Sequence, residues 1–343
     1  MKPFFALAIQ LKYASALKQK GKPTMTNFKS LLMFTSLIAL TLSGCESTPN
    51  QYGETIVTTP NKLELNGRRY AHAMVNDGEK LYVIGGASGK RLLSSIEVID
   101  PKTKRSTKLT QKIIPRRYFS AVWDGKESIY ILGGISTHGD KYQHEKTVEV
   151  FNTRTHRVTQ VKKLPAPTRT NAAVYKDGKI FVFGGSFPRA GTTKYQRLVS
   201  VYDIQRNSWM RGQDMPTAKA SKAFVKGDYV YLVGGYNGKQ GLNTFERYNT
   251  KLNRWQTLPN MPYRISAHSL ALSGDKLYVF GNYLDTTATY SFDFNTKQWA
   301  KANLDYVPAR HTAATIMDDT IYVSGGTTDV SGPNLDNIQV FKL

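Results

Sequence analysis

Short apolar runs separated by tight-turn residues make up the chain from about residue 55 onwards. The runs are rich in aromatic and β-branched residues, and no long stretch with helical periodicity follows residue 45. Such runs, bounded by Asp-Gly or Gly-Gly pairs, are typical of β-strands. The pattern of apolar and polar positions therefore predicts an all-β body.

Six of these runs end in glycine and recur along the chain. They are YVIGG (82–86), YILGG (130–134), FVFGG (181–185), YLVGG (231–235), YVFGN (278–282) and YVSGG (322–326). The first glycines are spaced 48, 51, 50, 47 and 44 residues apart. A tight-turn pair such as Asp77-Gly78 precedes each run, and such pairs join antiparallel strands. Because a third and a fourth apolar run follow, each repeat predicts one four-stranded unit.

The repeat resembles that of kelch β-propellers, since it combines a Gly-Gly doublet, a Tyr/Phe–Asp/Asn pair and, in three copies, Trp209, Trp255 or Trp299. The resemblance implies an all-β, six-bladed kelch β-propeller with four-stranded antiparallel blades over residues 54–343. The last copy ends after its third strand, which would leave an unpaired strand edge. We expect the N-terminal strand within residues 54–65 to complete the last blade.

The N-terminal part of the chain predicts a targeting segment. Residues 31–42 form an apolar run of about twelve residues, too short to span a membrane as a helix, and Ser43-Gly44-Cys45 follows. This arrangement resembles a bacterial lipoprotein signal and implies cleavage before Cys45 and lipidation of its thiol. We expect residues 1–24 to be a misassigned or dispensable extension, 25–44 a signal peptide, and 45–53 a lipidated tether. Because Glu46 is not Asp, the resemblance implies the cell envelope, on the periplasmic side of the outer membrane.

The net charge points to anionic partners. The chain holds 47 basic and 25 acidic residues, a formal charge of +22. Residues 1–44 contribute six lysines and no acid, so the remainder carries 41 basic against 25 acidic residues, or +16. A body this basic favours acidic sugars, phospholipid heads or acidic peptides, although a merely solvated surface is the alternative. An envelope address argues against nucleic acid as the partner.

A basic residue precedes the inner-strand run in every repeat. These residues are Arg69, Arg117, Arg169, Lys219, Arg264 and Arg310. A propeller places such positions around the mouth of its central channel. Kelch domains that bind acidic peptides carry arginines there, so the resemblance implies an anion-binding site at these six residues. The alternative is a structural role, in which they pair with Glu97, Glu149 or Glu246 on third strands.

Catalytic and metal chemistry have little support in the sequence. Cys45 is the only cysteine, and the six histidines show no close metal-ligand spacing, so we expect neither a metal nor a cofactor. His72 and His268 occupy equivalent inner-strand positions and would approach the channel together. The main prediction is an envelope protein that binds an anionic small molecule, a glycan or an acidic protein segment. The alternatives are a sugar mutarotase, because six-bladed kelch propellers include periplasmic sialic acid mutarotases, and a non-catalytic protein–protein scaffold.

Overall fold

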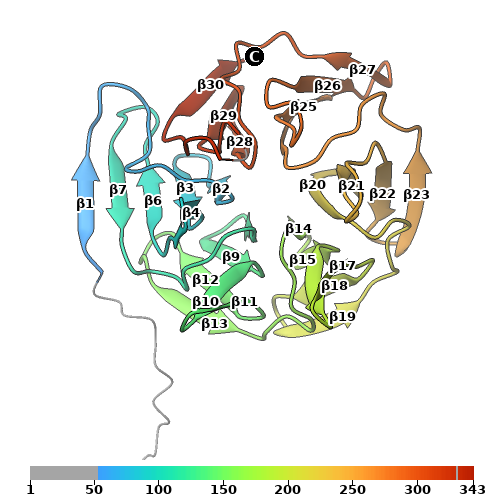
Figure 1. The fold of residues 1–343 in the computed structure, drawn as a ribbon, viewed down its shortest axis with the longest axis horizontal. Helices are drawn as coiled ribbons and strands as arrows, with labels where there is room; N and C mark the ends of the chain where they lie inside the picture. The colour runs from blue at the N-terminus through green and yellow to red at the C-terminus, as the bar shows by residue number, and fades with distance from the viewer. Residues whose placement is uncertain (1–52, 330) are drawn as a thin grey trace, which may run out of the picture. The chain divides into compact units, whose positions relative to one another are not determined.

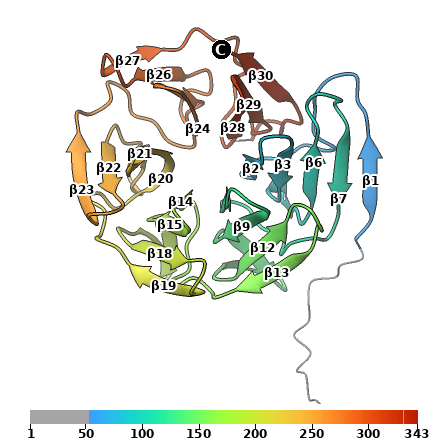
Figure 2. The same ribbon diagram turned by 180° about the vertical axis from the view of Figure 1, so that it is seen from behind.

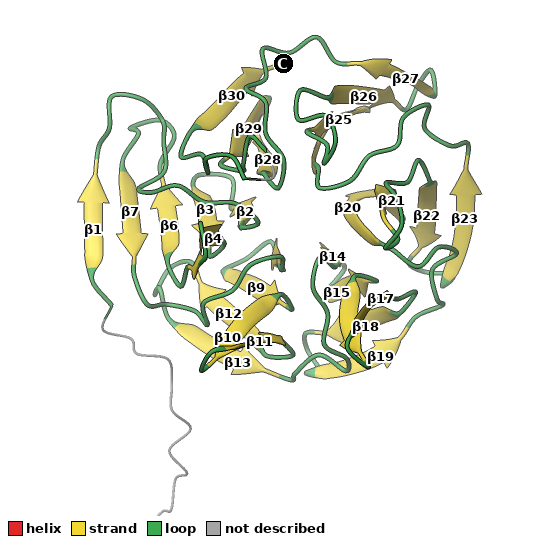
Figure 3. Ribbon diagram, viewed as in Figure 1, coloured by secondary structure: helices red, strands yellow, loops and turns green. Residues whose placement is uncertain are grey.

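The computed structural model describes residues 53–329 and 331–343, and this part of the chain consists of strands and loops without a helix (Figure 3). Six antiparallel sheets follow one another in chain order around a common axis (Figure 1). The predicted six-bladed β-propeller is therefore confirmed. The predicted signal peptide, residues 25–44, and the lipidation site Cys45 lie outside the described residues. Within the described part, no helix is long and apolar enough to span a membrane.

Each blade has its first strand nearest the axis. Blades one to three contain β2 (Ala73–Asn76), β3 (Leu81–Ile84), β6 (Ile96–Ile99) and β7 (Ser106–Leu109); β8 (Ser120–Trp123), β9 (Ser128–Leu132), β12 (Val148–Asn152) and β13 (Val158–Val161); and β14 (Ala172–Lys176), β15 (Lys179–Phe183), β18 (Val199–Asp203) and β19 (Ser208–Arg211). Blades four to six contain β20 (Ala220–Lys226), β21 (Tyr229–Tyr236), β22 (Phe245–Asn249) and β23 (Arg254–Leu258); β24 (Ser269–Ser273), β25 (Lys276–Phe280), β26 (Thr289–Asp293) and β27 (Gln298–Lys301); and β28 (Ala313–Met317), β29 (Thr320–Ser324) and β30 (Ile338–Lys342).

Three small hairpins extend the connections between second and third strands in the first three blades. They are β4 (Ala87–Ser88) with β5 (Arg91–Leu92), β10 (Ile135–His138) with β11 (Lys141–His144), and β16 (Ser186–Arg189) with β17 (Thr192–Tyr195). Each hairpin starts directly after a glycine doublet, whose residues have positive φ, such as 73° at Gly133 and 97° at Gly134. Glycine adopts this backbone conformation without a Cβ penalty, so the doublets redirect the chain at the end of each second strand.

The core consists of apolar clusters between neighbouring blades. One cluster joins β3 and β6 of blade one to β9 and β12 of blade two, and equivalent clusters follow around the ring. The last one packs Met74 and Val83 of blade one against Tyr322 and Ile338 of blade six. Because a blade is covered on both faces, its second strand is apolar almost throughout, and all four residues of β3 are buried.

The prediction that residues 54–65 complete the last blade is wrong. β1 (Thr55–Thr58) instead pairs antiparallel with β7, with Thr55 opposite Leu109, and becomes a fifth strand outside blade one. Figures 1 and 2 show β1 outside β7, at the outer edge of blade one and away from β30. β1 ends shortly before Pro60, which has no N–H to donate to a strand ladder and so disfavours a continuous strand through residues 58–62. Blade six accordingly has three strands among the described residues.

Contacts near the axis close the ring. The Leu65 N–H donates to the Asp336 carbonyl at 2.7 Å, and the Arg69 N–H donates to the Leu335 carbonyl at 3.0 Å. The Gly326 N–H of blade six donates to the Arg69 carbonyl at 2.8 Å. Strand β2 contacts both β8 and β28, and each inner strand likewise contacts its two neighbours. Closure therefore depends on the inner strands and on the segment leading into blade one, in which Glu64 forms an isolated antiparallel bridge to Asn337 beside β30.

Candidate functional site

The segments that lead into the six inner strands form one face of the propeller around the axis. We call the residues of these segments approach positions and number them from a shared hydrogen bond. At the first position, the backbone carbonyl accepts the N–H of the second glycine of the preceding blade's doublet. For example, the Gly86 N–H donates to the Arg116 carbonyl, and the Gly185 N–H donates to the Lys219 carbonyl, both at 2.9 Å. The first approach positions are then Arg69, Arg116, Thr168, Lys219, Ile265 and Ala309, and the fourth are His72, Phe119, Asn171, Lys222, His268 and Thr312.

The backbone at the second and third approach positions builds the channel mouth. At the second position, Arg117, Arg169 and Arg310 form β-bridges to the bases of the following hairpins or loops. At the third position, Tyr118 has a φ of 58° and its N–H donates to the Ala71 carbonyl of the neighbouring blade at 2.9 Å. The same inter-blade bond links Thr170 to Tyr118, Ala71 to His311, and His311 to Ala267. This backbone ring holds the mouth residues in fixed positions.

Blade four departs from this pattern. Its inner strand β20 begins at the second approach position, three residues earlier than the inner strands of the other blades, and a β-bulge lies between Ala220 and Lys222. The hydroxyl of Ser221 donates inward to the Val233 carbonyl at 2.9 Å, and Ser221 lacks the positive φ of its counterparts. Despite the bulge, Lys222 lines the channel at the same approach position as His72 and His268.

A cavity of about 420 Å³ occupies the mouth of the channel. Its walls include His72, Tyr118, Arg169, Tyr195, Lys222, Tyr236, His268, Tyr283 and His311. A second cavity of about 130 Å³ lies deeper along the inner strands and shares four residues with the first, namely His72, Phe119, Lys222 and Thr312. No Asp or Glu occurs among the described residues that line either cavity. The positive charges of Arg169 and Lys222 in these walls therefore favour a ligand with an anionic group.

Two of the six predicted cations lie inside blades, where they pair with carboxylates. Arg69 forms an ion pair with Glu97 and donates to the Gly85 carbonyl at 3.1 Å, and both side chains of the pair are buried. Lys219 lies 2.9 Å from Glu246, again with both side chains buried. The alternative role of these residues, pairing with third-strand acids, is therefore confirmed at both positions.

In blade two the equivalent residue is Arg116 and not the predicted Arg117. The Arg116 guanidinium lies 2.5 Å from Glu149 and donates to the Gly133 carbonyl at 3.0 Å. Arg117 follows it at the second approach position and points to the mouth, where it donates to the Tyr70 hydroxyl and lies 5.3 Å from the Tyr118 ring centroid. Consecutive arginines thus serve different roles, one in the blade and one at the mouth.

Three predicted arginines remain around the mouth without an ion pair to any described residue. Besides Arg117, these are Arg169, whose Nε donates to the Ser186 hydroxyl at 3.1 Å and which lines the cavity, and Arg310, which lies 4.0 Å from the Tyr283 ring centroid. Arg264 is exposed, donates to the Gly241 carbonyl at 3.3 Å, and is not part of the cavity wall. Of these three, only Arg169 lines the cavity; Arg117 and the buried Arg310 lie beside the wall residues Tyr118 and Tyr283.

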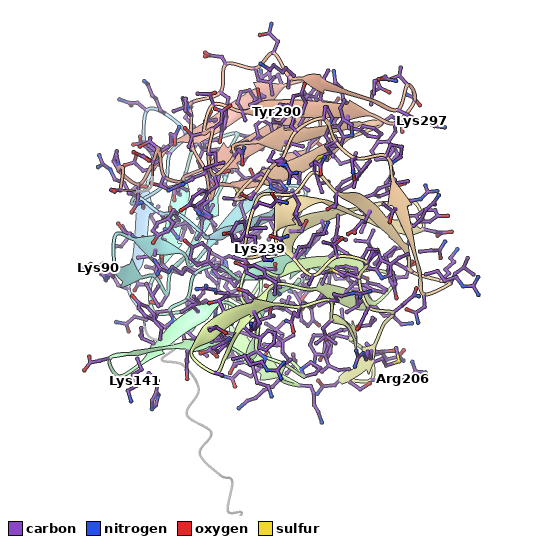
Figure 4. The ribbon with its side chains drawn as sticks, turned by 45° about the vertical axis from the view of Figure 1, so that its right-hand side comes forward. Lys90, Lys141, Arg206, Lys239, Tyr290 and Lys297 are labelled. Atoms are coloured by element: carbon purple, nitrogen blue, oxygen red, sulfur yellow. The ribbon has the colours of Figure 1, made fainter. Side chains whose placement is uncertain are left out.

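Further lysines surround this opening on the loops that follow the second strands. Lys90 and Lys141 lie at the turns of the β4–β5 and β10–β11 hairpins, and Lys239 lies in the turn after β21; all three are exposed. Figure 4 shows Lys90 and Lys141 projecting away from the body of the propeller. These side chains enlarge the positive region beyond the cavity itself.

Three histidines in the channel are neutral at physiological pH. Burial, with the charges of Lys222 and Lys219, lowers the pKa of His268 to about 3, and burial with the Arg310 charge lowers that of His311 to about 3. Burial also holds the pKa of His72 well below its ordinary value. His72 and His268, for which a repeat-pattern role is the favoured interpretation of the sequence, both line the larger cavity. The described residues contain no group of three His, Cys, Asp or Glu side chains suited to a metal ion.

Sequence reasoning missed Lys222 and the tyrosines of the mouth. Lys222 occupies the same approach position as His72 and His268, so an alignment of the repeats at that position would have indicated a channel residue. Tyr195, at the end of β17, and Tyr236, at the end of β21, carry no comparable signal, because the connections between second and third strands differ in length between repeats.

Six antiparallel sheets closed by their inner strands, with one basic mouth, define a repeat β-propeller. A family model described as the KLHDC2/KLHL20/DRC7 Kelch-repeats domain matches residues 71–282, more than half of the chain. The chain belongs to this kelch-repeat family.

Curated proteins with kelch-like names are similar to the chain. Kelch-like protein 25 of Xenopus tropicalis is 28% identical over 210 residues, which cover 57% of this chain and 34% of that protein. Kelch-like protein terF of Aspergillus terreus is 28% identical over 239 residues, covering 64% of this chain and 51% of that protein. The leucine-zipper-like transcriptional regulator 1 homolog of Drosophila melanogaster is 24% identical over 301 residues, which cover 78% of this chain and 30% of that protein. The chain thus spans about a third to a half of the length of these relatives.

Proposed function

We propose that this protein is a non-catalytic binding module whose channel mouth takes an acidic segment of a partner protein. The observation that carries the proposal is the cavity of about 420 Å³, whose described walls include Arg169 and Lys222 but no Asp or Glu. Arg117 and Arg310 lie directly behind these walls, against the rings of Tyr118 and Tyr283. Guanidinium groups bind carboxylates through paired hydrogen bonds, so these arginines offer sites for Asp or Glu side chains.

The side chains around the mouth are those that dominate protein interfaces. Tyr142, Tyr236 and Tyr283 are among the exposed large hydrophobic residues, and Leu284, next to Tyr283, is 90% exposed. Tyrosine and arginine are enriched among residues that contribute most to protein–protein binding. The membership of the chain in the kelch-repeat family and its similarity to kelch-like proteins support a binding role over catalysis.

An acidic sugar or glycan carries the same carboxylate group and is the second source of ligand that the mouth suits. The lipid anchor at Cys45 and the periplasmic, outer-membrane address remain predictions from the sequence. With them, the proposal places the binding partner in the cell envelope.

A displayed library of peptides that vary in Asp and Glu content, with an array of neutral and acidic glycans in parallel, tests the proposal. We expect enrichment of acidic peptides and at least tenfold weaker binding when their carboxylates are replaced by amides. Arg169→Met should weaken binding of the selected peptide at least tenfold. Arg206→Met is the matched control, because Arg206 lies in the turn between β18 and β19 and pairs with Asp203 in its own blade.

Two results would contradict this function. Unchanged peptide binding by the Arg169→Met variant would remove the mouth from the interface. Selection of acidic glycans without any peptide would replace the protein partner by a carbohydrate one.

A further inference from the structure

The fourth approach positions form a narrow layer inside the channel. His72, Phe119, Lys222 and Thr312 line both the larger cavity above this layer and the smaller one below it, and His268 lines the larger cavity. The layer lies deeper than the arginines of the mouth, which occupy the second approach positions. It is therefore a set of side chains separate from the mouth arginines.

Lys222 is the only lysine in the described walls of either cavity. Within the described part of the chain its ammonium group forms no ion pair and no hydrogen bond, whereas Lys219, three residues earlier, is paired with Glu246. Burial lowers the pKa of Lys222, and no carboxylate offsets this effect. An amine in such a position interacts strongly with any anion that enters, because little water screens the charge.

The two histidines beside it have unused hydrogen-bonding capacity. His268 is 1% exposed; it contacts the Val233 backbone, and neither of its ring nitrogens makes a hydrogen bond of good geometry. His72 is 3% exposed; its Nε2 lies 2.8 Å from the Ser324 hydroxyl, while its Nδ1 has no partner. Both side chains line the larger cavity with Lys222, but the unpartnered nitrogens are covered by protein, so a ring must turn to offer one of them to a polar ligand group.

We propose that Lys222, together with His72 and His268, forms a carboxylate-binding site inside the channel. The ammonium group of Lys222 supplies the charge, and a neutral imidazole supplies one N–H donor to a carboxylate oxygen. This site is distinct from the arginine-lined mouth, and it does not require the acidic segment proposed above. The carboxylate comes either from a side chain of a bound segment or from a small organic acid.

The space around the site limits the size of a free ligand. The larger cavity lies within the range of volumes typical for small-molecule sites. Tyr118 and Tyr195 line the same cavity nearer the mouth and offer ring surfaces to the body of a ligand whose carboxylate lies at Lys222. A compact organic acid with a flat or apolar body fits this arrangement.

Benzoate and benzamide are the probes, because they have nearly the same shape and differ in charge. We expect isothermal titration calorimetry on the full chain to show binding of benzoate and at least tenfold weaker binding of benzamide. Lys222→Met should weaken benzoate binding at least tenfold without lowering the thermal unfolding midpoint, since it removes a partly buried charge that has no ion pair. Lys251→Met is the matched control; it removes an exposed lysine from the turn between β22 and β23 of the same blade and should leave benzoate binding unchanged.

Equal binding of benzoate and benzamide, or unchanged benzoate binding by the Lys222 variant, would overturn the site. Lys222→Gln provides the same test if the methionine variant fails to fold.

Arg169→Met should reduce binding of an acidic peptide and leave benzoate binding within about twofold. If benzoate binding depends on Lys222 but no acidic peptide binds, the proposed function is refuted and the carboxylate site inside the channel still stands. If the Lys222 variant also weakens peptide binding, the carboxylate comes from the segment; if only benzoate binding falls, it comes from a small acid.

Discussion

Arg116 and Glu149 form an ion pair of 2.5 Å in which both side chains are completely buried. Glu149 also accepts a hydrogen bond from the Ile114 N–H at 3.0 Å, and Arg116 donates to three carbonyl oxygens. The pair ties the segment leading into blade two to the third strand of that blade. Arg69–Glu97 and Lys219–Glu246 make the same connection in blades one and four.

Removing one partner of such a pair should destabilise the propeller strongly. Arg116→Met leaves the Glu149 carboxylate buried and uncompensated, so we expect a loss of about 3–5 kcal/mol in the free energy of unfolding. Arg68→Met is the control, because Arg68 and its partner Asp336 are both exposed; its expected effect is below about 1 kcal/mol. Chemical denaturation of both variants provides the measurement. Similar small losses in the two variants would show that the buried pair does not support the fold.

The neutral histidines of the channel should make stability depend on pH. The folded-state pKa of His268 is about 3, whereas an unfolded histidine has a pKa of about 6.5. Between these values the unfolded chain binds a proton that the folded protein does not, so stability falls as the pH is lowered from about 6.5 to about 3. For His268 alone the loss at pH 4.5 is roughly 2–3 kcal/mol.

Unfolding midpoints at pH 7.5 and 4.5 measure this dependence. His268→Asn should reduce the difference between the two midpoints, because the variant has one titrating group fewer. His138→Asn changes an exposed histidine of the β10–β11 hairpin and should leave the difference as it is. An equal pH dependence in all three proteins would mean that His268 is protonated in the folded state.

Gly326 should tolerate substitution far less than Gly274, although both glycines have a positive φ. A Cβ at Gly326 would lie 2.6 Å from the Thr312 methyl group and 2.8 Å from the Arg310 carbonyl, at a φ of 101°. At Gly274, where φ is 52°, a Cβ meets nothing within 4 Å. We expect Gly274→Ala to cost about 1 kcal/mol and Gly326→Ala several times more, because only the latter must displace the contacts that close the ring. Thermal unfolding compares the two; equal losses would contradict a special role of Gly326 in closure.

The outer strand β1 should contribute little to stability. Three of its four residues are exposed, including Val57, so Val57→Lys is expected to change the free energy of unfolding by less than about 0.5 kcal/mol. Leu65 is buried between blades six and one, and Leu65→Ala should cost about 2–5 kcal/mol. Denaturant titration of both variants checks this. A large loss from Val57→Lys would indicate that β1 is needed to hold the ring together.

The sequence by itself determined the repeated part of this protein. Glycine doublets, turn pairs and apolar runs are local signals, and their six-fold repetition fixed the number of blades and the strands within them. The acids Glu97, Glu149 and Glu246 were also predicted as partners of basic residues, because they recur at one position of the third strand. These predictions hold because each depends on residues within one repeat.

Only the tertiary structure decided the features that break the repeat. Arg116 and Arg117 are adjacent, and a shift of one residue exchanges the buried side chain for the one at the mouth; only the inter-blade hydrogen bond from Gly86 fixes that register. β1 pairs with the outer edge of blade one and not with that of blade six, and no local sequence pattern distinguishes these two edges. The bulge between Ala220 and Lys222 breaks the regular strand pairing in blade four. Each of these outcomes depends on contacts between segments far apart in the chain, and such contacts leave no periodic signal in the sequence.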